Sequence, residues 1–495
     1  MNKVVIIGID GMDPDCVLKW KSDLPNLSKF RMSKMKSVFP PDSISAWVTI
    51  FTGLNPAQHG ILHSIDYLTN RSKDFSIDTN ILRGRTFWDI ASKSGRRVCI
   101  INPFLAYPPW YVNGVMVSGP VFITGAKDAF PRSILKKYSI PPLGGIVDFP
   151  TSNMLWDFFI KSKKDTEDLA DFGIRLLKEQ NWDLYFITFL TLDRIQHFFW
   201  RYSDEGDPTY PGKNCYQNVI KEFYQLFDEI VGEFASFIDE NTVLLVISDH
   251  GHGRRCTKSL NLNEFLRKEG YLAPKIKGIE FLQPKYWMER AKTSYLNFVY
   301  RYSLEDITMK IARFIPKKGE LKKSTYITDF DDSLAWVDKN FSGMNPFGGV
   351  RLNRLRIEKE NLNYDKVRKK IMQDIAHLRD PKNGRQIVKW IRRREEIYQG
   401  EFISKYPDIV FELNEEYGLG FSLYLPIVSL NVTHKKISGG HKKYGVFFSR
   451  DMNAEIDNMC SSILCVTPTI FNILGIKGDD RFNREAILKN GYSSD

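Results

Sequence analysis

Three aspartates in this sequence each follow an apolar run, and two of them stand close to a histidine. Asp10 follows the run IIGI, Asp193 follows LYFITFLTL, and Asp249 follows LLVIS. His197 comes four residues after Asp193, and His250 comes directly after Asp249. Side chains four residues apart lie on one face of a helix, so Asp193 and His197 can hold one cation. A mixed set of oxygen and nitrogen donors suits Zn²⁺, with Mn²⁺ or Fe²⁺ as alternatives.

A hydroxyl group and a further histidine stand in turns framed by proline or glycine. The stretch PPDSISAW places Ser43 and Ser45 at the start of a helical pattern, where free backbone N–H groups favour an anion such as a phosphoryl group. Either serine can cap this helix, so the local sequence leaves open which of them has a chemical role. In SGGH, two glycines free the backbone to bring His441 close to other groups. Together, the carboxylates, histidines and hydroxyl group indicate a metal-dependent site.

The elements that position these residues are indicated by apolar runs that alternate with helical patterns. Four runs bounded by turn residues predict strands, namely Val4–Ile9, Val98–Asn102, Leu184–Leu190 and Val243–Ser248. Helical patterns lie at 165–180 and 216–238. This order predicts an α/β fold with a central, mostly parallel sheet and helices on both faces. Because ligands gather at the carboxyl ends of parallel strands, we expect the three aspartates to meet at one edge of that sheet.

The second half of the chain is less regular. A basic helical stretch is predicted over 286–316, and a second charged helical stretch over 363–394, interrupted at Asp380-Pro381. Strand-like sequence returns at Ile409–Leu413 and Val446–Phe448.

Composition excludes several classes of protein. The chain has 495 residues, of which 43% are hydrophobic and 26% charged, as in ordinary globular proteins. It is therefore not a disordered chain or a collagenous repeat, and no run of about 18 apolar residues predicts a membrane span. The apolar run at the N-terminus is too short for a signal peptide, and the six cysteines show no CxxC spacing. We expect free thiols and a cytoplasmic protein.

The positive charge is concentrated in one segment. Residues 254–323 contain 17 Lys and Arg against seven Asp and Glu, which accounts for +10 of the formal charge of +11. Within this segment five residues share one face of a predicted helix: Trp287, Ala291, Tyr295, Phe298 and Tyr302. The interpretation we favour is a helical cap whose aromatic face packs on the core while its charges stay solvated. The alternatives are an electropositive rim for a phosphorylated substrate and a helix lying on anionic lipid through 285–315. Nucleic-acid binding ranks last, because no recognised module is present.

The motifs, taken in order, resemble those of the alkaline phosphatase superfamily. The stretches that carry the resemblance are IIGIDGMDPD, LPNL, SVFPPDSISAWVTIFTGLNPAQHGI, TLDRIQHFFW, SDHGHG, GGHKKYGVFF and PTIFNILGI. The chain is most similar to the type I phosphodiesterase/nucleotide pyrophosphatase branch and related phosphohydrolases. The resemblance runs from Lys3 to about Arg484 and is weakest from Pro274 to Tyr326.

The resemblance implies roles for particular residues. It implies that Ser43 is the nucleophile, because the family's hydroxyl group stands nine residues before the Thr of the Thr-Gly turn. It implies two divalent metal ions. One would be held by Asp10, Ser43, Asp249 and His250, and the other by Asp193, His197 and His441. His252 falls where the family has no ligand, and His59 is expected to support the turn.

The expected function is hydrolysis of a small phosphorylated substrate through a phosphoseryl intermediate, with a diester or nucleotide pyrophosphate favoured over a monoester. His63-Ser64 replaces an Asn of nucleotide pyrophosphatases, so nucleotide specificity does not follow. Three alternatives stay open: a phosphomutase or phosphotransferase, a membrane-surface enzyme acting on lipid- or glycan-linked phosphate, and a non-catalytic binding protein. The chain is expected to divide into a core over 1–273, a basic helical cap over 274–326 and the rest of the core over 327–495. Its oligomeric state is not indicated.

Overall fold

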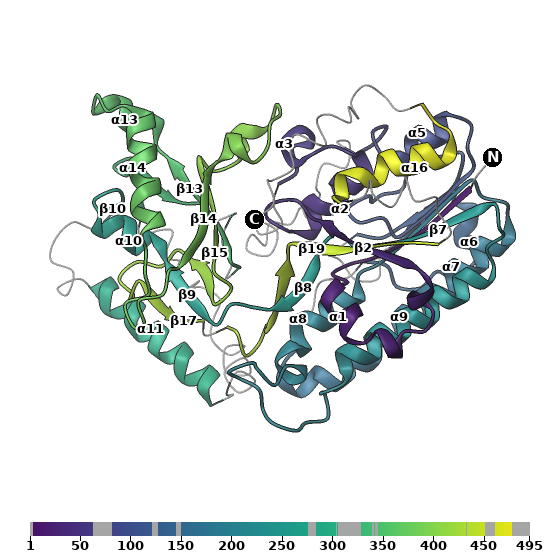
Figure 1. Ribbon diagram of the computed structural model, residues 1–495, viewed down its shortest axis with the longest axis horizontal. Helices are drawn as coiled ribbons and strands as arrows, with labels where there is room; N and C mark the ends of the chain where they lie inside the picture. The colour runs from purple at the N-terminus through teal and green to yellow at the C-terminus, as the bar shows by residue number, and fades with distance from the viewer. Residues whose placement is uncertain are drawn as a thin grey trace.

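The computed structural model shows two lobes, with an eight-stranded sheet in the larger one (Figure 1). It describes residues 3–62, 82–120, 127–144, 150–275, 284–302, 304, 328–338, 341, 345–431, 433–450 and 461–477. His63-Ser64, Cys460 and most of the basic segment beyond residue 302 lie outside these ranges.

The large sheet has the strand order β2-β19-β7-β1-β6-β3-β4-β5. Its strands are β1 (Lys3–Ile9), β2 (Arg31–Lys36), β3 (Val98–Ile101), β4 (Gly114–Ser118), β5 (Asp128–Phe130), β6 (Leu184–Phe189), β7 (Thr242–Ile247) and β19 (Tyr444–Ser449). The five strands from β7 to β4 are parallel, and β19, β2 and β5 are antiparallel to their neighbours. The α/β fold with a mostly parallel sheet is therefore confirmed.

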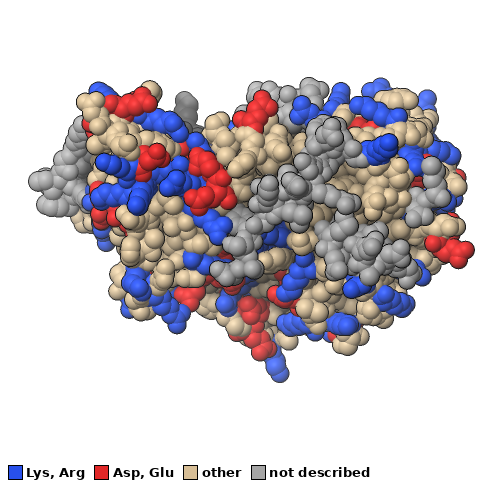
Figure 2. Space-filling model, turned by 45° about the horizontal axis from the view of Figure 1, so that its top comes forward, with Lys and Arg blue, Asp and Glu red and all other residues tan. Residues whose placement is uncertain are grey.

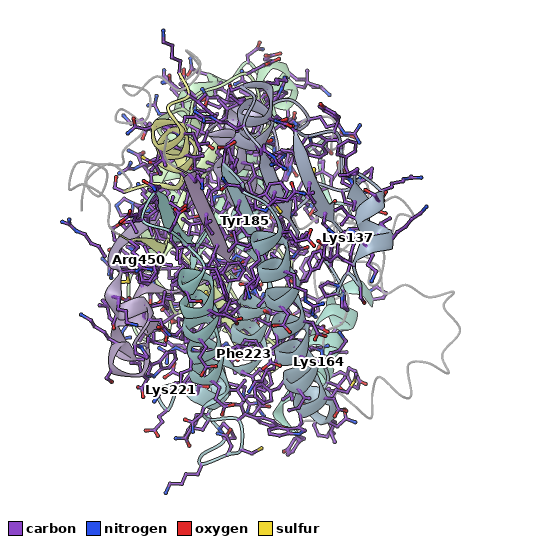
Figure 3. All side chains as sticks on the ribbon, turned by 90° about the vertical axis from the view of Figure 1, so that its right-hand side faces the viewer. Lys137, Lys164, Tyr185, Lys221, Phe223 and Arg450 are labelled. Atoms are coloured by element: carbon purple, nitrogen blue, oxygen red, sulfur yellow. The ribbon has the colours of Figure 1, made fainter. Side chains whose placement is uncertain are left out.

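Helices cover both faces of this sheet because its central strands are apolar on both sides. Val4 and Ile6 of β1 enter the core beneath α2, α5 and α16, while Val5 and Ile7 enter the core beneath α7, α8 and α9. Figure 3 shows Tyr185 of β6 in this second layer, and its hydroxyl donates to the Gly173 carbonyl of α7 at 2.7 Å. The helices of this lobe are α1 (Pro14–Lys19), α2 (Ser43–Thr52), α3 (Pro56–His59), α5 (Phe87–Lys93), α6 (Ser133–Lys137), α7 (Leu155–Glu179), α8 (Thr191–Ser203), α9 (Val219–Ser236) and α16 (Val466–Leu474).

The smaller lobe has sheets and a hydrophobic core of its own. A four-stranded antiparallel sheet has the order β12-β13-β15-β14, and a three-stranded sheet has the order β16-β9-β17. The strands are β9 (Lys258–Asn261), β10 (Ala273–Pro274), β11 (Thr328–Asp329), β12 (Ala335–Val337), β13 (Phe347–Leu352), β14 (Val388–Arg393), β15 (Ile409–Leu413), β16 (Tyr417–Gly420) and β17 (Val428–Leu430). The helices are α10 (Leu262–Lys268), α11 (Pro284–Arg301), α13 (Arg354–Lys359) and α14 (Tyr364–Ala376). Short 3-10 helices in the chain are Lys21–Asp23, Leu27–Lys29, Ser152–Met154, Arg394–Glu396, Ile403–Lys405 and Ile463–Cys465.

One helix prediction is wrong in its second half. The stretch 363–394 forms helix α14, but Val388–Arg393 is strand β14, paired with β15. Val388 is buried and Lys389 is exposed, an alternation that suits a sheet, and tertiary pairing overrides the helical propensity of the basic residues. Basic and acidic side chains stand side by side on the surface of this lobe (Figure 2). Lys389 of β14 forms an ion pair with Glu412 of β15.

The three-segment division of the chain stays a prediction, but the structure refines where the strands belong. The strands between Thr328 and Leu430 lie in the smaller lobe, and β18 (Gly439–Lys442) and β19 return to the larger one. None of the helices in the described ranges combines the length and apolar character that crossing a membrane requires.

Candidate metal centre

The carboxyl ends of three neighbouring strands place the aspartates together. Strand β1 lies between β7 and β6 and is parallel to both. Asp10 follows β1, Asp249 follows β7, and Asp193 lies in the first turn of α8, which begins two residues after β6. The strand-end prediction therefore describes the observed edge of the sheet.

Helix α2 brings a hydroxyl group to this edge. Asp42 is the N-cap, because its side chain accepts from the N–H of Ile44 at 3.1 Å, and Ser43 is the first helical residue. The Ser43 Oγ lies 3.0 Å from His250 Nε2 and donates to Asp10 Oδ1 at 3.3 Å. The Ser45 hydroxyl instead donates to the Asp42 carbonyl at 3.3 Å. Of the two serines, Ser43 is the one at the cluster.

The first cluster consists of Asp10, Asp249 and His250, all buried. His250 Nε2 lies 3.6 Å from Asp10 Oδ1 and 3.3 Å from Asp249 Oδ2. The indole N–H of Trp47 donates to the other oxygen of Asp10 at 2.9 Å, and the N–H of Gly11 donates to Asp249 Oδ1 at 3.3 Å. Each carboxylate is thus held by one oxygen while the other faces the cluster.

The second cluster consists of Asp193, His197, His252 and His441. His197 Nε2 lies 3.3 Å from Asp193 Oδ2 and 3.1 Å from His441 Nε2. His441 Nε2 and His252 Nε2 lie 3.5 Å and 3.3 Å from Asp193 Oδ1. The donor atoms of the four side chains lie within 4.8 Å of one another.

Backbone carbonyls orient three of the imidazoles. The Nδ1 atoms of His197, His250 and His441 lie 2.9, 2.9 and 3.0 Å from the carbonyls of Gly439, Gly251 and Pro41. A proton on Nδ1 leaves the lone pair of Nε2 directed into the clusters. This is the arrangement of metal-ligating histidines.

The two clusters fit divalent cations. Asp193 Oδ1 and Asp249 Oδ2 are buried without a hydrogen-bond partner in the described part of the chain, which is costly unless a cation lies against them. Burial and the neighbouring carboxylates raise the pKa of Asp10 well above its usual value, and burial raises that of Asp249 to about 6. Burial and the nearby His250 hold the pKa of His441 well below its usual value. A bound cation reverses this penalty on the carboxylates and uses the neutral imidazoles as ligands.

The structure brings together every residue expected at the site, and one more. Asp10, Ser43, Asp249 and His250 form one group, and Asp193, His197 and His441 lie in the other, the same two groups that the resemblance implies. His252, for which the resemblance implies no role, lies in the second group. No local sequence signal indicates it, because its place is set by the pairing of strand Gly251–Arg254 with β18, which puts His252 opposite His441. His59 lies elsewhere, with its ring bonded to Thr49 and Ile61.

Comparison with known proteins places the chain in a family. A sequence model described as type I phosphodiesterase / nucleotide pyrophosphatase matches residues 4–434. Over 92 residues the chain is 28% identical to venom phosphodiesterase 2 of Crotalus adamanteus. Over 90 residues it is 29% identical to ectonucleotide pyrophosphatase/phosphodiesterase family member 3 of Mus musculus. These matches cover 18% and 17% of the chain, and 11% and 10% of the two relatives.

A solved structure supports the fold over nearly the whole chain. The structure of phosphonoacetate hydrolase from Sinorhizobium meliloti 1021 is similar, with a TM-score of 0.52 and 15% sequence identity. The superposition covers 96% of this chain and 95% of the hydrolase chain. At this identity the likeness concerns the fold alone.

Proposed function

We propose, because the chain belongs to the type I phosphodiesterase / nucleotide pyrophosphatase family, that it is a metal-dependent hydrolase of phosphate esters. The observation that carries the proposal is the Ser43 hydroxyl, which lies within 3.3 Å of two members of a carboxylate and histidine cluster. We favour a small phosphodiester or nucleotide pyrophosphate over a monoester as substrate. The cytoplasmic location expected from the sequence stays a prediction.

Ser43 acts as the nucleophile in this proposal. Two divalent ions, for which zinc is the best match to the donor set, would lower the pKa of the Ser43 hydroxyl and neutralise charge on the phosphate oxygens. The Ser43 hydroxyl loses its proton as its Oγ bonds to phosphorus, and the bond to the leaving oxygen breaks, so that the leaving group departs and takes up a proton. The oxygen of a water molecule then bonds to phosphorus, the bond from Oγ to phosphorus breaks, and Oγ takes up a proton as the phosphate product is released.

The protein's own groups position this step. The hydrogen bond to Asp10 and the contact with His250 hold the Ser43 oxygen at the strand edge. Ser43 is also the first residue of α2, so the positive end of the helix dipole faces the charge that develops on the phosphoryl group.

The test compares two chromogenic substrates on the purified chain. We expect hydrolysis of bis-p-nitrophenyl phosphate to exceed that of p-nitrophenyl phosphate, to stop after chelation, and to return with added Zn²⁺. Activity that survives complete metal removal would contradict metal dependence. A preference for the monoester would contradict the substrate class while leaving the hydrolase proposal in place.

A peripheral membrane contact is a second proposal, favoured by α11. Four aromatic side chains of α11 and the residue after it are 55–59% exposed: Trp287, Tyr295, Phe298 and Tyr302. The expectation that this face packs on the core is therefore wrong. Figure 1 places α11 on the outer side of the smaller lobe. An exposed aromatic face on a helix with an excess of Lys and Arg suits anionic lipid. We propose that the enzyme can reach lipid- or glycan-linked phosphate in this way.

A further inference from the structure

His252 is a buried imidazole that the proposed reaction does not use. Its side chain is fully buried, and both ring nitrogens lack a hydrogen-bond partner among the described residues. A buried polar group without a partner costs free energy, so it is uncommon in a folded protein unless a ligand completes it. The Nε2 atom lies 3.3 Å from Asp193 Oδ1, which also lacks a hydrogen-bond partner.

Strand pairing places this ring in the second cluster. Strand β8 (Gly251–Arg254) is antiparallel to β18, and its register sets His252 opposite His441. The backbone N–H of His252 donates to Asp13 Oδ2 at 3.2 Å, which anchors the residue from the other side. The position of His252 is therefore determined by the same backbone that positions His441.

Packing fixes the orientation of the ring. The indole of Trp200 stacks on it, with ring centroids 5.8 Å apart, and the His197 ring meets it edge-on at 4.6 Å. Gly439 provides the remaining space, because a Cβ atom there would stand 2.5 Å from His252 Cε1. Packing therefore holds the ring without a hydrogen bond to its nitrogens from the part of the chain that the structure describes, and its Nε2 lies 3.3 Å from Asp193 Oδ1.

We propose that His252 is a fourth protein ligand of the metal ion held by Asp193, His197 and His441. The proposal rests on the proposed function, since it assigns one more ligand to the same metal centre. Three imidazoles and one carboxylate saturate a tetrahedral site, whereas the Asp10 cluster offers three side chains and the Ser43 hydroxyl. The Asp193 site is therefore the tighter of the two and keeps its ion when the other is lost.

The alternative role for His252 is that of a hydrogen-bond donor. A proton on Nε2 could be donated to Asp193 Oδ1 and orient that carboxylate as a ligand. The two roles differ in which side chains can substitute for the imidazole. Glutamine can donate a hydrogen bond but is a poor substitute for an imidazole ligand, and phenylalanine can do neither.

The experiment titrates Co²⁺ into the metal-free full-length protein and follows visible absorption and binding heat. We expect two bound ions in the wild type, and a loss of affinity at one site of about 100-fold or more in both His252→Gln and His252→Phe, with an altered absorption spectrum. His197→Gln is the control for a lost ligand. His434→Gln is the control for a buried histidine outside the cluster, since His434 bonds to Asp207 at 2.7 Å.

The outcomes separate the two proposals. If the wild type binds no divalent ion, the proposed function fails. If the wild type binds two ions and His252→Gln keeps the wild-type affinities and spectrum, His252 is a donor or a bystander and the inference is wrong. Should both variants misfold, proton NMR of the wild-type Co²⁺ protein decides. We expect hyperfine-shifted imidazole N–H signals from His197, His250, His252 and His441, and the absence of the His252 signal overturns the inference.

Discussion

At the scale of single residues, the two clusters are in direct contact through one histidine ring from each. The His250 ring belongs to the first cluster and the His441 ring to the second, and they stack with centroids 3.9 Å apart. Ser43 contacts His250, and the backbone carbonyl of Pro41 orients His441. The chain segment 41–43 therefore contacts both clusters. A substrate held at Ser43 is within reach of both sets of ligands, which suits a phosphoryl group with charge on several oxygens.

Replacing Ser43, the proposed nucleophile, is the most direct test at this scale. We expect Ser43→Ala to lower turnover of bis-p-nitrophenyl phosphate by roughly 10³-fold or more, because Ser43 is the hydroxyl group that contacts Asp10 and His250 and would form the phosphoseryl bond. Metal affinity is expected to change far less than turnover, since the three side chains of the first cluster remain. The measurement is kcat together with Co²⁺ binding.

The matched control for that change is Ser45→Ala, two residues away in the same helix. Its hydroxyl bonds to the Asp42 carbonyl and not to the cluster. Activity within a few-fold of wild type is expected. Equal losses in both variants would mean that α2 itself is disturbed and would remove Ser43 from the proposed role.

His59 yields a prediction about pH. Burial lowers the pKa of His59 to about 3, while its Nδ1 accepts from the N–H of Ile61 at 3.1 Å. The unfolded chain takes up a proton near pH 6.5 and the folded chain does not, so stability is lost as the pH falls from 6.5 towards 3. Between pH 7 and pH 5 this residue accounts for about 2 kcal/mol of the decrease in unfolding free energy.

The measurement compares urea unfolding of the metal-free wild type and His59→Asn at both pH values. Asparagine can still accept the Ile61 N–H but does not titrate. The decrease from pH 7 to pH 5 should be smaller in the variant by about 2 kcal/mol. The same decrease in both proteins would mean that His59 is protonated in the folded state.

At the scale of elements, the sequence predicted the parallel core well. The first core strand was expected from Val4 and begins at Lys3, and the strand expected over Val243–Ser248 is Thr242–Ile247. These strands are buried on both faces, so they form continuous apolar runs that local sequence reveals. The carboxylates could be placed for the same reason, because each follows such a run.

The smaller lobe and His252 were harder to predict. Strand β14 is half-exposed and basic, and what makes it a strand is its pairing with β15, a tertiary contact. The role of β8 depends on pairing with β18, nearly 190 residues later, and no local pattern in GHGR indicates it. The fold of the core follows from local periodicity, whereas the second metal cluster is completed by long-range pairing.

The prediction at the scale of elements concerns membrane binding through helix α11. We expect the full chain to co-sediment with vesicles containing anionic lipid at low salt, and binding to weaken as salt rises, because Lys and Arg contribute alongside the aromatic face. The double substitution of Trp287→Glu and Phe298→Glu should abolish binding, since both side chains are more than half exposed.

The control for the helix is Trp156→Glu on α7, where the indole is 50% exposed in the larger lobe. This change should leave vesicle binding intact. Loss of binding in all variants would indicate general hydrophobic adsorption, and no binding of the wild type at low salt would remove the membrane proposal.

At the scale of the whole molecule, the metal centre joins distant parts of the chain. Its candidate ligands come from the residue after β1, from α8, from the segment after β7, from β8 and from β18, so residues far apart between Asp10 and His441 meet at one place. All of these elements belong to the larger lobe, while the smaller lobe has a separate hydrophobic core. Metal binding is therefore linked to the folding of the larger lobe.

This linkage predicts how metal removal affects stability. An ion that binds only the folded chain adds about 2.7 kcal/mol per site at a free concentration one hundred times its dissociation constant. Chelation should therefore lower the melting temperature, and Zn²⁺ should restore it, in a calorimetric scan of the full chain. In Asp193→Asn the increment on adding Zn²⁺ should fall by roughly half, because one of two sites is lost, whereas Ser45→Ala should keep the full increment. Despite its burial, the neighbouring His197 holds the pKa of Asp193 well below its usual value, so Asp193→Asn should also lower the stability of the metal-free protein, and the increment is measured against the metal-free variant itself. If Zn²⁺ at saturating concentrations left the melting temperature of the wild type unchanged, the ligands would not be brought together by folding. That result would contradict the expected linkage between metal binding and stability.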